Sequence, residues 1–210
     1  DNITWTGTFS PTNSSEDSSN TLSLATSYTD TAGNSGPAAT TSNYAVDTKA
    51  PSLSETSAVS SPTSDNTPSY TFSSGEAGTI TYGGSCSSST SSASSGSNAI
   101  TFTALDDGTY SDCTITVTDS SGNVSSTLSV TSFIVAVPPV LAEVTGVSTP
   151  TTDSTPDYIF SSTEAGTISY GGACSSSSLS SAISGNNTVT LTQSDNSTAL
   201  DDGSYDNCTI

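Results

Sequence analysis

Four cysteines are the side chains of this 210-residue chain whose spacing most clearly suggests chemistry. Cys86 and Cys113 lie in one stretch, and Cys174 and Cys208 lie at matching places in a later, similar stretch. Four cysteines allow three pairings, and the similarity of the two stretches selects Cys86–Cys113 and Cys174–Cys208. The alternative is two unpaired buried thiols in each stretch. Paired cysteines would indicate an oxidising, extracytoplasmic compartment.

Carboxylates form the second group that could do chemistry. The chain carries 20 Asp and Glu residues against one cation, Lys49, and its formal net charge is −19. This charge argues against binding to nucleic acid or to an anionic membrane surface, because nothing neutralises phosphates, and it favours binding of cations. Histidine and arginine are both absent. The usual general bases, oxyanion clamps and zinc-binding imidazoles are therefore missing, and we expect no enzyme.

The adjacent carboxylates Asp106 and Asp107, in the sequence LDDG, could be mistaken for a catalytic pair. The same motif returns at Asp201 and Asp202. Adjacent residues on a tight turn point apart, whereas the two carboxylates of a glycosidase must flank one bond. We therefore interpret LDDG as a recurring structural turn.

An internal repeat sets the organisation of the chain. Residues 51–86 return as residues 139–174 with 23 identical positions among 36, and residues 105–115 return as residues 200–210. Self-similarity at this length indicates an array of similar units rather than one enzyme domain.

Pro-containing linkers at Asp47–Pro51 and Ala136–Val140 divide this array. We expect a partial domain over residues 1–50, which lacks its N-terminal strands. A complete domain follows over residues 51–137, and a truncated domain over residues 138–210 stops before its last hairpin and final strand.

Short strand signals that alternate with turns predict an all-β sandwich without helices. The strands expected in the complete domain are Leu53–Val59, Thr67–Ser73, Thr79–Tyr82, Ile100–Thr103, Cys113–Thr118 and Val124–Val135. Alternation after Cys113 places this cysteine on the core face, and a β-bulge would bring Tyr110 there as well. The motif TDSSGN at residues 118–123 predicts a hairpin turn in which Asp caps the turn amides and Gly supplies a positive φ.

The segment Ser87–Ser97 is nearly all serine. Low complexity of this kind predicts an exposed, flexible loop. The alternative is an O-glycosylated patch, for which Ser87, Ser88, Ser89 and Thr90 are the candidate acceptors.

These turn and strand motifs resemble a known family. Residues 1–50, with TWTGTFSPT, YTDTAGNSG and NYAVDTKAP, resemble the C-terminal half of the bacterial Ig-like repeats of very large surface adhesins and biofilm-associated proteins. The copies from Pro51 and Pro139, with DNTPSYTF, EAGTI, LDDGTY and TDSSGN, resemble a second bacterial Ig-like type with an added cysteine pair. The resemblance covers essentially the whole chain. It implies tandem Ig-like antiparallel β-sandwich domains in an elongated array.

The resemblance also implies calcium, which often stiffens the junctions between such domains. Calcium takes six to eight oxygen ligands. Stacked Ig-like domains would bring Glu16, Asp17 and Asp47 toward Glu76, Asp119 and Asn123 at the first junction, and Asp106 and Asp107 of the LDDG turn toward Glu164 at the second. The alternative is that each Asp only caps its own turn.

Together these features predict a structural role, as an extracellular spacer, stalk or filament segment of a large bacterial surface adhesin. Such a segment would be secreted or held at the cell surface and would extend a distal binding region from the cell. Adjacent Ig-like repeats of the same polypeptide are the expected partners. No apolar run approaches the roughly 18–20 residues of a membrane span, so we expect no membrane insertion.

Two other functions compete with the spacer. The first is a glycan- or protein-binding Ig-like module, which would need a clustered, exposed aromatic platform, whereas Trp5 lies in a predicted strand. The second is a self-assembling extracellular fibre subunit, in which identical chains exchange strands. The incomplete first and last domains would present the open sheet edges that strand exchange requires. The alternative, which we favour, is that the sequence is a window trimmed from a longer polypeptide.

Overall fold

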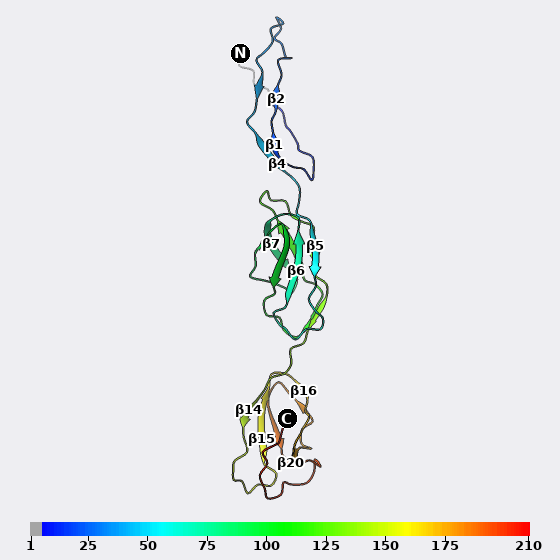
Figure 1. The fold of residues 1–210 in the computed structure, drawn as a ribbon, viewed down its shortest axis with the longest axis vertical. Coiled ribbons are helices and arrows are strands. Elements are labelled where there is room, and N and C mark those ends of the chain that lie inside the picture. Colours follow the sequence, from blue (N-terminus) through cyan, green and yellow to red (C-terminus); the bar gives the residue numbers. More distant parts are fainter. Residues whose placement is uncertain (1–5) are drawn as a thin grey trace. The chain divides into compact units, whose positions relative to one another are not determined.

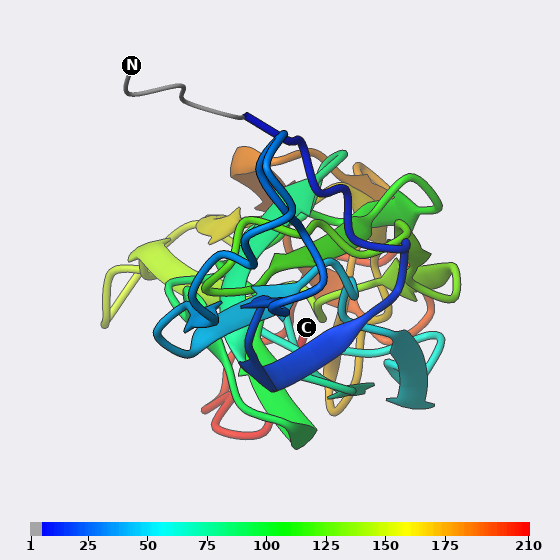
Figure 2. The same cartoon turned by 90° about the horizontal axis from the view of Figure 1, so that it is seen from above.

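The computed structural model describes residues 6–210, so Trp5 lies outside the described residues. Over this range the chain forms strands, turns and loops and contains no helix (Figures 1 and 2). The fold is all-β, as predicted. The chain divides into two compact units, Asp1–Val137 and Pro138–Ile210. Residues up to 50 belong to the same unit as residues 51–137, and the division of this unit into a partial and a complete domain stays a prediction.

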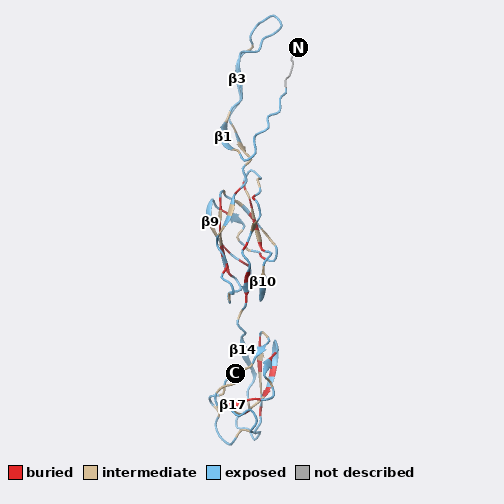
Figure 3. Ribbon diagram, turned by 90° about the vertical axis from the view of Figure 1, so that its right-hand side faces the viewer, coloured by how far each residue is buried: buried red, intermediate tan, exposed pale blue. Residues whose placement is uncertain are grey.

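The first part of the first unit, residues 6–50, is a ribbon of paired strands without a core of its own. Its strands pair β1 with β4 and β2 with β3, and they are β1 (Glu16–Asn20), β2 (Ser23–Leu24), β3 (Ala39–Thr40) and β4 (Tyr44–Asp47). Nearly every residue of the ribbon is exposed, whereas buried residues gather in the domain that follows (Figure 3). An isolated two-stranded ribbon is marginally stable at best. Its contacts with the following domain therefore matter for its order.

Residues 51–137 form an antiparallel β-sandwich of the Ig-like kind. One sheet has the order β5–β6–β9, with strands β5 (Leu53–Ser57), β6 (Ser69–Ser74) and β9 (Gly96–Thr101). The other has the order β12–β11–β7–β8, with strands β7 (Gly78–Gly83), β8 (Ser92–Ala93), β11 (Thr114–Thr118) and β12 (Leu128–Ser129). A further pair joins β10 (Gly108–Tyr110) to β13 (Phe133–Val135). Side chains from both sheets meet in a single apolar core.

Alternation along the strands supplies this core. In β6, Tyr70 and Phe72 are buried, whereas Thr71 between them is half-buried and Ser69 before them is exposed. In β11, Ile115 and Val117 are buried, and the threonines beside them are only half-buried. Successive side chains of a strand point to opposite faces, so each strand contributes every second residue to the core.

Four stacked aromatic rings run through the core. The ring centroids of Tyr70 and Phe102 are 5.9 Å apart, and those of Phe102 and Phe133 are 6.0 Å apart. Tyr110 stacks on the other side of Phe133 at 5.3 Å. Phe133 is 0% exposed. It therefore links the aromatic side chains of the first sheet to the β10–β13 pair.

The structure does not contain the expected β-bulge between Tyr110 and Cys113. β10 ends at Tyr110 and pairs with β13, whereas β11 begins at Thr114 and pairs with β7 and β12. Between Tyr110 and Cys113 the chain leaves the pairing with β13 and enters the pairing with β7 and β12. The two side chains therefore do not have to lie in one continuous strand to reach the core. The break between β10 and β11 has the effect that was predicted for a bulge.

The second unit repeats part of the sandwich. Its main sheet has the order β14–β15–β19, with strands β14 (Leu141–Thr145), β15 (Asp157–Ser162) and β19 (Gly185–Thr190). Two short pairs complete it, formed by β16 (Gly166–Thr167) with β18 (Ser181–Ala182) and by β17 (Cys174–Ser175) with β20 (Thr192–Gln193). The buried cluster of this unit is much smaller and centres on Phe160, Ala182 and Val189.

We expect Phe133→Ala to destabilise the first unit by about 3–5 kcal/mol, because it removes a fully buried ring from the aromatic stack. Ile134→Ala is the matched control, since this neighbouring side chain is 43% exposed. Differential scanning calorimetry of both variants checks the prediction. Equal transition temperatures for the two variants would mean that the stack does not stabilise the domain.

Candidate functional site

Both predicted disulfides are present, each within one copy of the repeat. The Cα atoms are 5.2 Å apart in Cys86–Cys113 and 5.2 Å apart in Cys174–Cys208. Cys86 follows β7 and Cys113 precedes β11, and these two strands are hydrogen-bonded neighbours. The first bond closes a sequence separation of 27 residues. Loop-closure entropy for a loop of this size corresponds to about 3.5 kcal/mol of stabilisation in the chain-entropy model.

A glycine beside each disulfide lets two backbone segments approach closely. Gly84 has φ +74°, and a Cβ atom at this position would lie 2.1 Å from the carbonyl oxygen of Asp112. Gly172 has φ +77° and faces Asn207 in the same way. Any other residue would clash with this backbone and would be strained at positive φ. Gly84 and Gly172, the second glycines of the two YGG motifs, therefore allow two backbone segments to lie close together just before Cys86 and Cys174.

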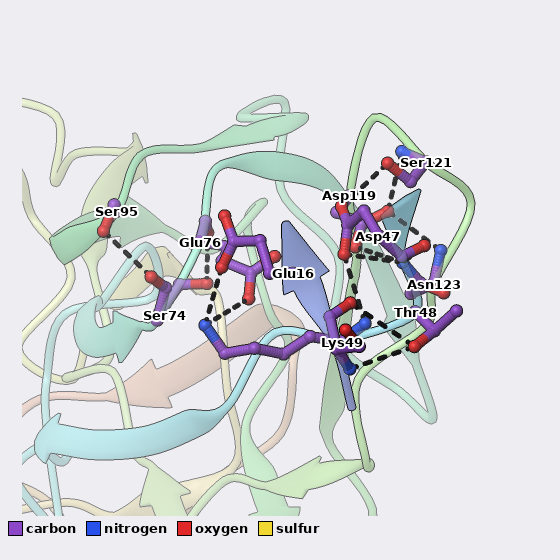
Figure 4. Close-up of polar contacts among 12 residues, drawn as sticks. Glu16, Asp47, Thr48, Lys49, Ser74, Glu76, Ser95, Asp119, Ser121 and Asn123 are labelled. Atoms are coloured by element: carbon purple, nitrogen blue, oxygen red, sulfur yellow. Dashed lines mark hydrogen bonds and ion pairs between the residues drawn. The ribbon is translucent and has the colours of Figure 1, made fainter. Parts of the chain in front are cut away.

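Three carboxylates gather where the ribbon meets the sandwich. The acidic cluster consists of Asp47, Glu76 and Asp119, whose nearest carboxylate oxygens all lie within 4.8 Å of one another. Asp47 ends β4, Glu76 lies in the turn between β6 and β7, and Asp119 follows β11 (Figure 4). The structure thus brings together the three carboxylates among the four residues predicted for a metal site at this junction, and the fourth residue, Asn123, lies beside them.

Asp119 is held by the predicted turn. Its Oδ1 accepts hydrogen bonds from the backbone N–H groups of Ser121 and Asn123 at 2.8 and 2.9 Å, and Gly122 has φ +90°. The residue is 9% exposed. Burial acts to raise the pKa of Asp119, but the hydrogen bonds from Asn123 outweigh burial and hold the pKa below its usual value. The carboxylate is therefore ionised at neutral pH.

Asn123 faces the acidic cluster with its amide nitrogen. Nδ2 of Asn123 donates to Oδ2 of Asp119 at 2.9 Å and to the carbonyl oxygen of Asp47 at 3.3 Å. Ser121 adds a hydroxyl that donates to Oδ2 of Asp47 at 2.7 Å. In this arrangement Asn123 is a hydrogen-bond donor between ribbon and sandwich. As a metal ligand, Asn123 would have to rotate its side-chain amide so that the oxygen faces the acidic cluster. Its predicted role as a metal ligand stays a prediction.

Lys49, the only cation in the sequence, lies beside the acidic cluster. Its Nζ is 3.0 Å from Oε2 of Glu16 in the ribbon and 3.2 Å from Oε1 of Glu76 in the sandwich (Figure 4). Hydrogen bonds and charges of the two glutamates raise the pKa of Lys49. Sequence reasoning did not assign this role to Lys49, although a single cation among 20 acidic residues was the signal that could have drawn attention to it.

The acidic cluster has donor chemistry that suits a hard cation. It offers carboxylate oxygens, the carbonyl of Asp47 and the hydroxyl of Ser121, and calcium is bound by oxygens of these kinds. Oε1 of Glu76 is shielded from solvent, and Lys49 Nζ lies 3.2 Å from it as an ion-pair partner. These residues fit a calcium ion, and occupancy by calcium stays a prediction.

The Ser-rich segment differs from the expected flexible loop. It contains β8, which pairs with β7, and the start of β9, which pairs with β6. The hydroxyl of Ser88 donates to the carbonyl oxygen of Thr101 at 2.7 Å, and that of Ser87 bonds to Thr103. Ser89 is exposed and Thr90 is half-buried. Glycosylation at Ser87, Ser88, Ser89 or Thr90 stays a prediction.

The LDDG turn is a structural turn in the first unit. The hydroxyl of Tyr110 donates to the carbonyl oxygen of Asp106 at 2.9 Å, and Oδ1 of Asp107 accepts the N–H of Val137 at 2.9 Å. The predicted approach of this turn to Glu164 stays a prediction.

Comparison with known proteins gives one match. Residues 1–46 match the family model described as a bacterial Ig-like domain. No curated protein and no solved structure matches the chain. The match supports the bacterial Ig-like family for the ribbon, which is less than a quarter of the 210 residues. Bacterial Ig-like domains and disulfides are both consistent with an extracellular protein. Within residues 6–210 no helix is long and apolar enough to cross a membrane.

Replacement of Lys49 by Met is expected to loosen the ribbon from the sandwich by a small, salt-dependent amount, because the Lys49 side chain is 48% exposed and solvent screens its ion pairs with Glu16 and Glu76. The amide hydrogens of β4 should exchange faster in Lys49→Met than in the unchanged chain, by no more than severalfold, and Lys49→Arg should keep the unchanged rate.

The raised pKa of Lys49 also predicts a pH dependence. The contribution of Lys49 to stability is complete below the unfolded-state pKa of 10.5 and is lost as pH rises through the higher folded-state pKa. Unchanged exchange in Lys49→Met at low salt would contradict this role.

Proposed function

We propose that this chain is an extracellular structural spacer of a bacterial surface protein, which extends a distal binding region away from the cell. The observation that carries the proposal is the recurrence of one disulfide-closed β pattern in two consecutive units. Repeated units that each carry their own stabilising bond suit a role in which every unit must resist unfolding separately. On this proposal the chain performs no catalysis, and its function is mechanical.

The position of each disulfide supports a mechanical role. Cys86–Cys113 connects the ends of two neighbouring strands, β7 and β11. A force applied to the two ends of the chain would pass through this bond. The loop between the cysteines then stays closed even when the domain unfolds. A sandwich with few apolar residues gains most from such a bond, because its core alone supplies little stability.

We further propose that the acidic cluster holds a calcium ion at the junction of ribbon and sandwich. Asp47 belongs to the ribbon, whereas Glu76 and Asp119 belong to the sandwich. An ion bound by all three carboxylates would relieve the repulsion among them and would restrain the ribbon against the sandwich. Secretion or attachment to the bacterial surface is part of the same proposal and supplies the calcium-containing medium.

Single-molecule stretching of the whole chain tests the spacer. With the disulfides intact, the first unit should lengthen by about 90 Å less on unfolding than after reduction, because a 27-residue separation stays closed. The second unit should lengthen by about 110 Å less, because its bond spans 34 residues. A chain that extends smoothly under low force, without separate unfolding steps, would rule out a load-bearing spacer.

Isothermal titration calorimetry with calcium tests the acidic cluster. We expect weak binding with a Kd of about 10⁻⁴–10⁻³ M, which is typical of extracellular modules. Asp119→Asn should abolish binding, whereas Asp106→Asn removes the same charge from a turn outside the acidic cluster and should retain it. Equal loss in both variants would indicate unspecific attraction by the net charge.

A further inference from the structure

The sequence offers one cleavage site to proteases that cut after basic residues. Lys49 is the only Lys or Arg among the 210 residues. Serine proteases of the trypsin type hold such a side chain in a pocket whose carboxylate recognises the positive charge. The residue that follows is Ala50, which is small and exposed. The Lys49–Ala50 peptide bond is therefore the one bond of this sequence that fits this class of enzyme.

The side chain of Lys49 is held by carboxylates of both the ribbon and the sandwich. Its Nζ lies 3.0 Å from Oε2 of Glu16 and 3.2 Å from Oε1 of Glu76 (Figure 4). The side chain of Glu76 is only 16% exposed. A protease pocket that binds the ammonium group has to take it away from both glutamates.

The backbone just before Lys49 is hydrogen-bonded within the ribbon. The N–H of Thr48 donates to the carbonyl oxygen of Ser15 at 2.7 Å, and the carbonyl oxygen of Thr48 accepts the N–H of Ser14 at 3.3 Å. Oγ1 of Thr48 donates to the carbonyl oxygen of Thr12 at 2.8 Å. Recognition of an extended peptide uses hydrogen bonds to its backbone groups. In the folded chain the backbone groups of Thr48 are already engaged.

The sandwich holds the chain on both sides of the Lys49–Ala50 bond. Before the bond, Oγ of Ser121 donates to Oδ2 of Asp47 at 2.7 Å, and Nδ2 of Asn123 donates to the carbonyl oxygen of Asp47 at 3.3 Å. After the bond, Pro51 is buried. The contacts of Asp47 with Ser121 and Asn123, and of Lys49 with Glu76, are called the junction contacts below. The bond thus lies in a short segment that is fixed at both ends.

Neither disulfide spans this segment. Cys86–Cys113 and Cys174–Cys208 both lie after Lys49. Buried residues gather in residues 51–137, whereas nearly every residue of the ribbon is exposed. Once the peptide bond is cut, only non-covalent contacts connect the part of the chain before Ala50 to the sandwich. Cleavage at this bond therefore allows that part to leave.

We propose that the Lys49–Ala50 bond is a processing site for a serine protease of trypsin specificity, and that the junction contacts protect it. Opening of the junction exposes the bond, and cleavage then releases the part of the chain before Ala50 from the disulfide-closed units. The protease serine takes the acyl group of Lys49, while the Ala50 nitrogen leaves with a proton as a new amino terminus. Water then hydrolyses the acyl-enzyme and leaves a carboxylate on Lys49.

Opening of the junction controls the rate of cleavage. Where opening and closing are fast relative to cleavage, the rate equals the population of the open form multiplied by the rate for an unfolded substrate. Each change that weakens the junction contacts therefore speeds cleavage. Salt is one such change, because it screens the ion pair of Lys49 with Glu76.

Trypsin digestion of the whole oxidised chain tests the proposal. A synthetic peptide with the sequence of residues 43–55 is the unprotected reference, and it should be cut at least about 100-fold faster than the chain. Mass spectrometry without reduction should show two products, residues 1–49 and residues 50–210. Size-exclusion chromatography should separate them, because no disulfide joins them.

A serine variant of the sandwich tests the protection and leaves the sequence around the cleaved bond unchanged. Ser121→Ala removes the hydrogen bond to Asp47 and should speed cleavage about fivefold. Ser120→Ala is the matched control, since this neighbour in the same turn is exposed, and it should be cut at the unchanged rate.

A glutamate variant tests the ion pair. Glu76→Gln removes the sandwich partner of Lys49 and should speed cleavage about threefold. Glu164→Gln makes the same change at the equivalent position of the second unit and should not alter the rate. Amide hydrogen exchange of β6 should be unchanged in every variant. Unchanged exchange of β6 assigns faster cleavage to the junction and not to unfolding of the sandwich.

Several results would overturn the proposal. Equal cleavage rates of the chain and the peptide would mean that the bond is not protected. Equal rates of the Ser121→Ala and Ser120→Ala chains, or faster cleavage matched by faster exchange of β6, would mean that the junction contacts do not protect it. Products that stay together in size-exclusion chromatography would rule out release. The proposal rests neither on the spacer role nor on calcium, because stretching and calcium titration can fail without changing the cleavage rates.

Discussion

Closure of a thin apolar core by the last strand of the domain is the constraint on which the rest of the structure depends. Only 30% of the residues are hydrophobic, so each core side chain carries a large share of the stability. In the first unit Phe133 completes the aromatic stack, and Cys86–Cys113 ties β7 to β11. In the second unit the disulfide recurs beside a smaller buried cluster that centres on Phe160, Ala182 and Val189. In the first unit the covalent bond and the aromatic stack are separate contributions to stability, because they join different strands.

Many carboxylates of the described residues accept hydrogen bonds from backbone or hydroxyl groups instead of pairing with cations. Glu55 accepts from Thr131 between β12 and β13, and Asp119 accepts from its own turn. Such acceptors hold the backbone in place and stay ionised without a counterion. The exception is the junction of ribbon and sandwich, where Lys49 pairs with Glu76 beside two further carboxylates.

The sequence predicts the features that depend on neighbours along the chain. Alternation predicts the core faces of β6 and β11, the repeat predicts both disulfide pairs, and TDSSGN predicts the turn at Asp119. Features that depend on partners far apart in sequence were missed. The change of sheet between Tyr110 and Cys113 follows from pairing with β13 and β7, and the Ser-rich segment forms strands because β6 and β7 supply its hydrogen bonds. The donor role of Asn123 depends on a side-chain orientation that no local pattern encodes.

Hydrogen exchange on the intact, oxidised chain tests most directly whether the last strand of residues 51–137 decides the stability of their sandwich. The amides of β6 (Ser69–Ser74), which pairs on both sides in its sheet, report on the core that β13 covers. If β13 completes this core, the amides of β6 should exchange at least tenfold faster in Phe133→Ala than in the unchanged chain, whereas Ile134→Ala, at an exposed position, should leave their exchange unchanged. Equal protection of β6 in the two variants would contradict this account, since the sandwich would then be as stable without the Phe133 ring as with it.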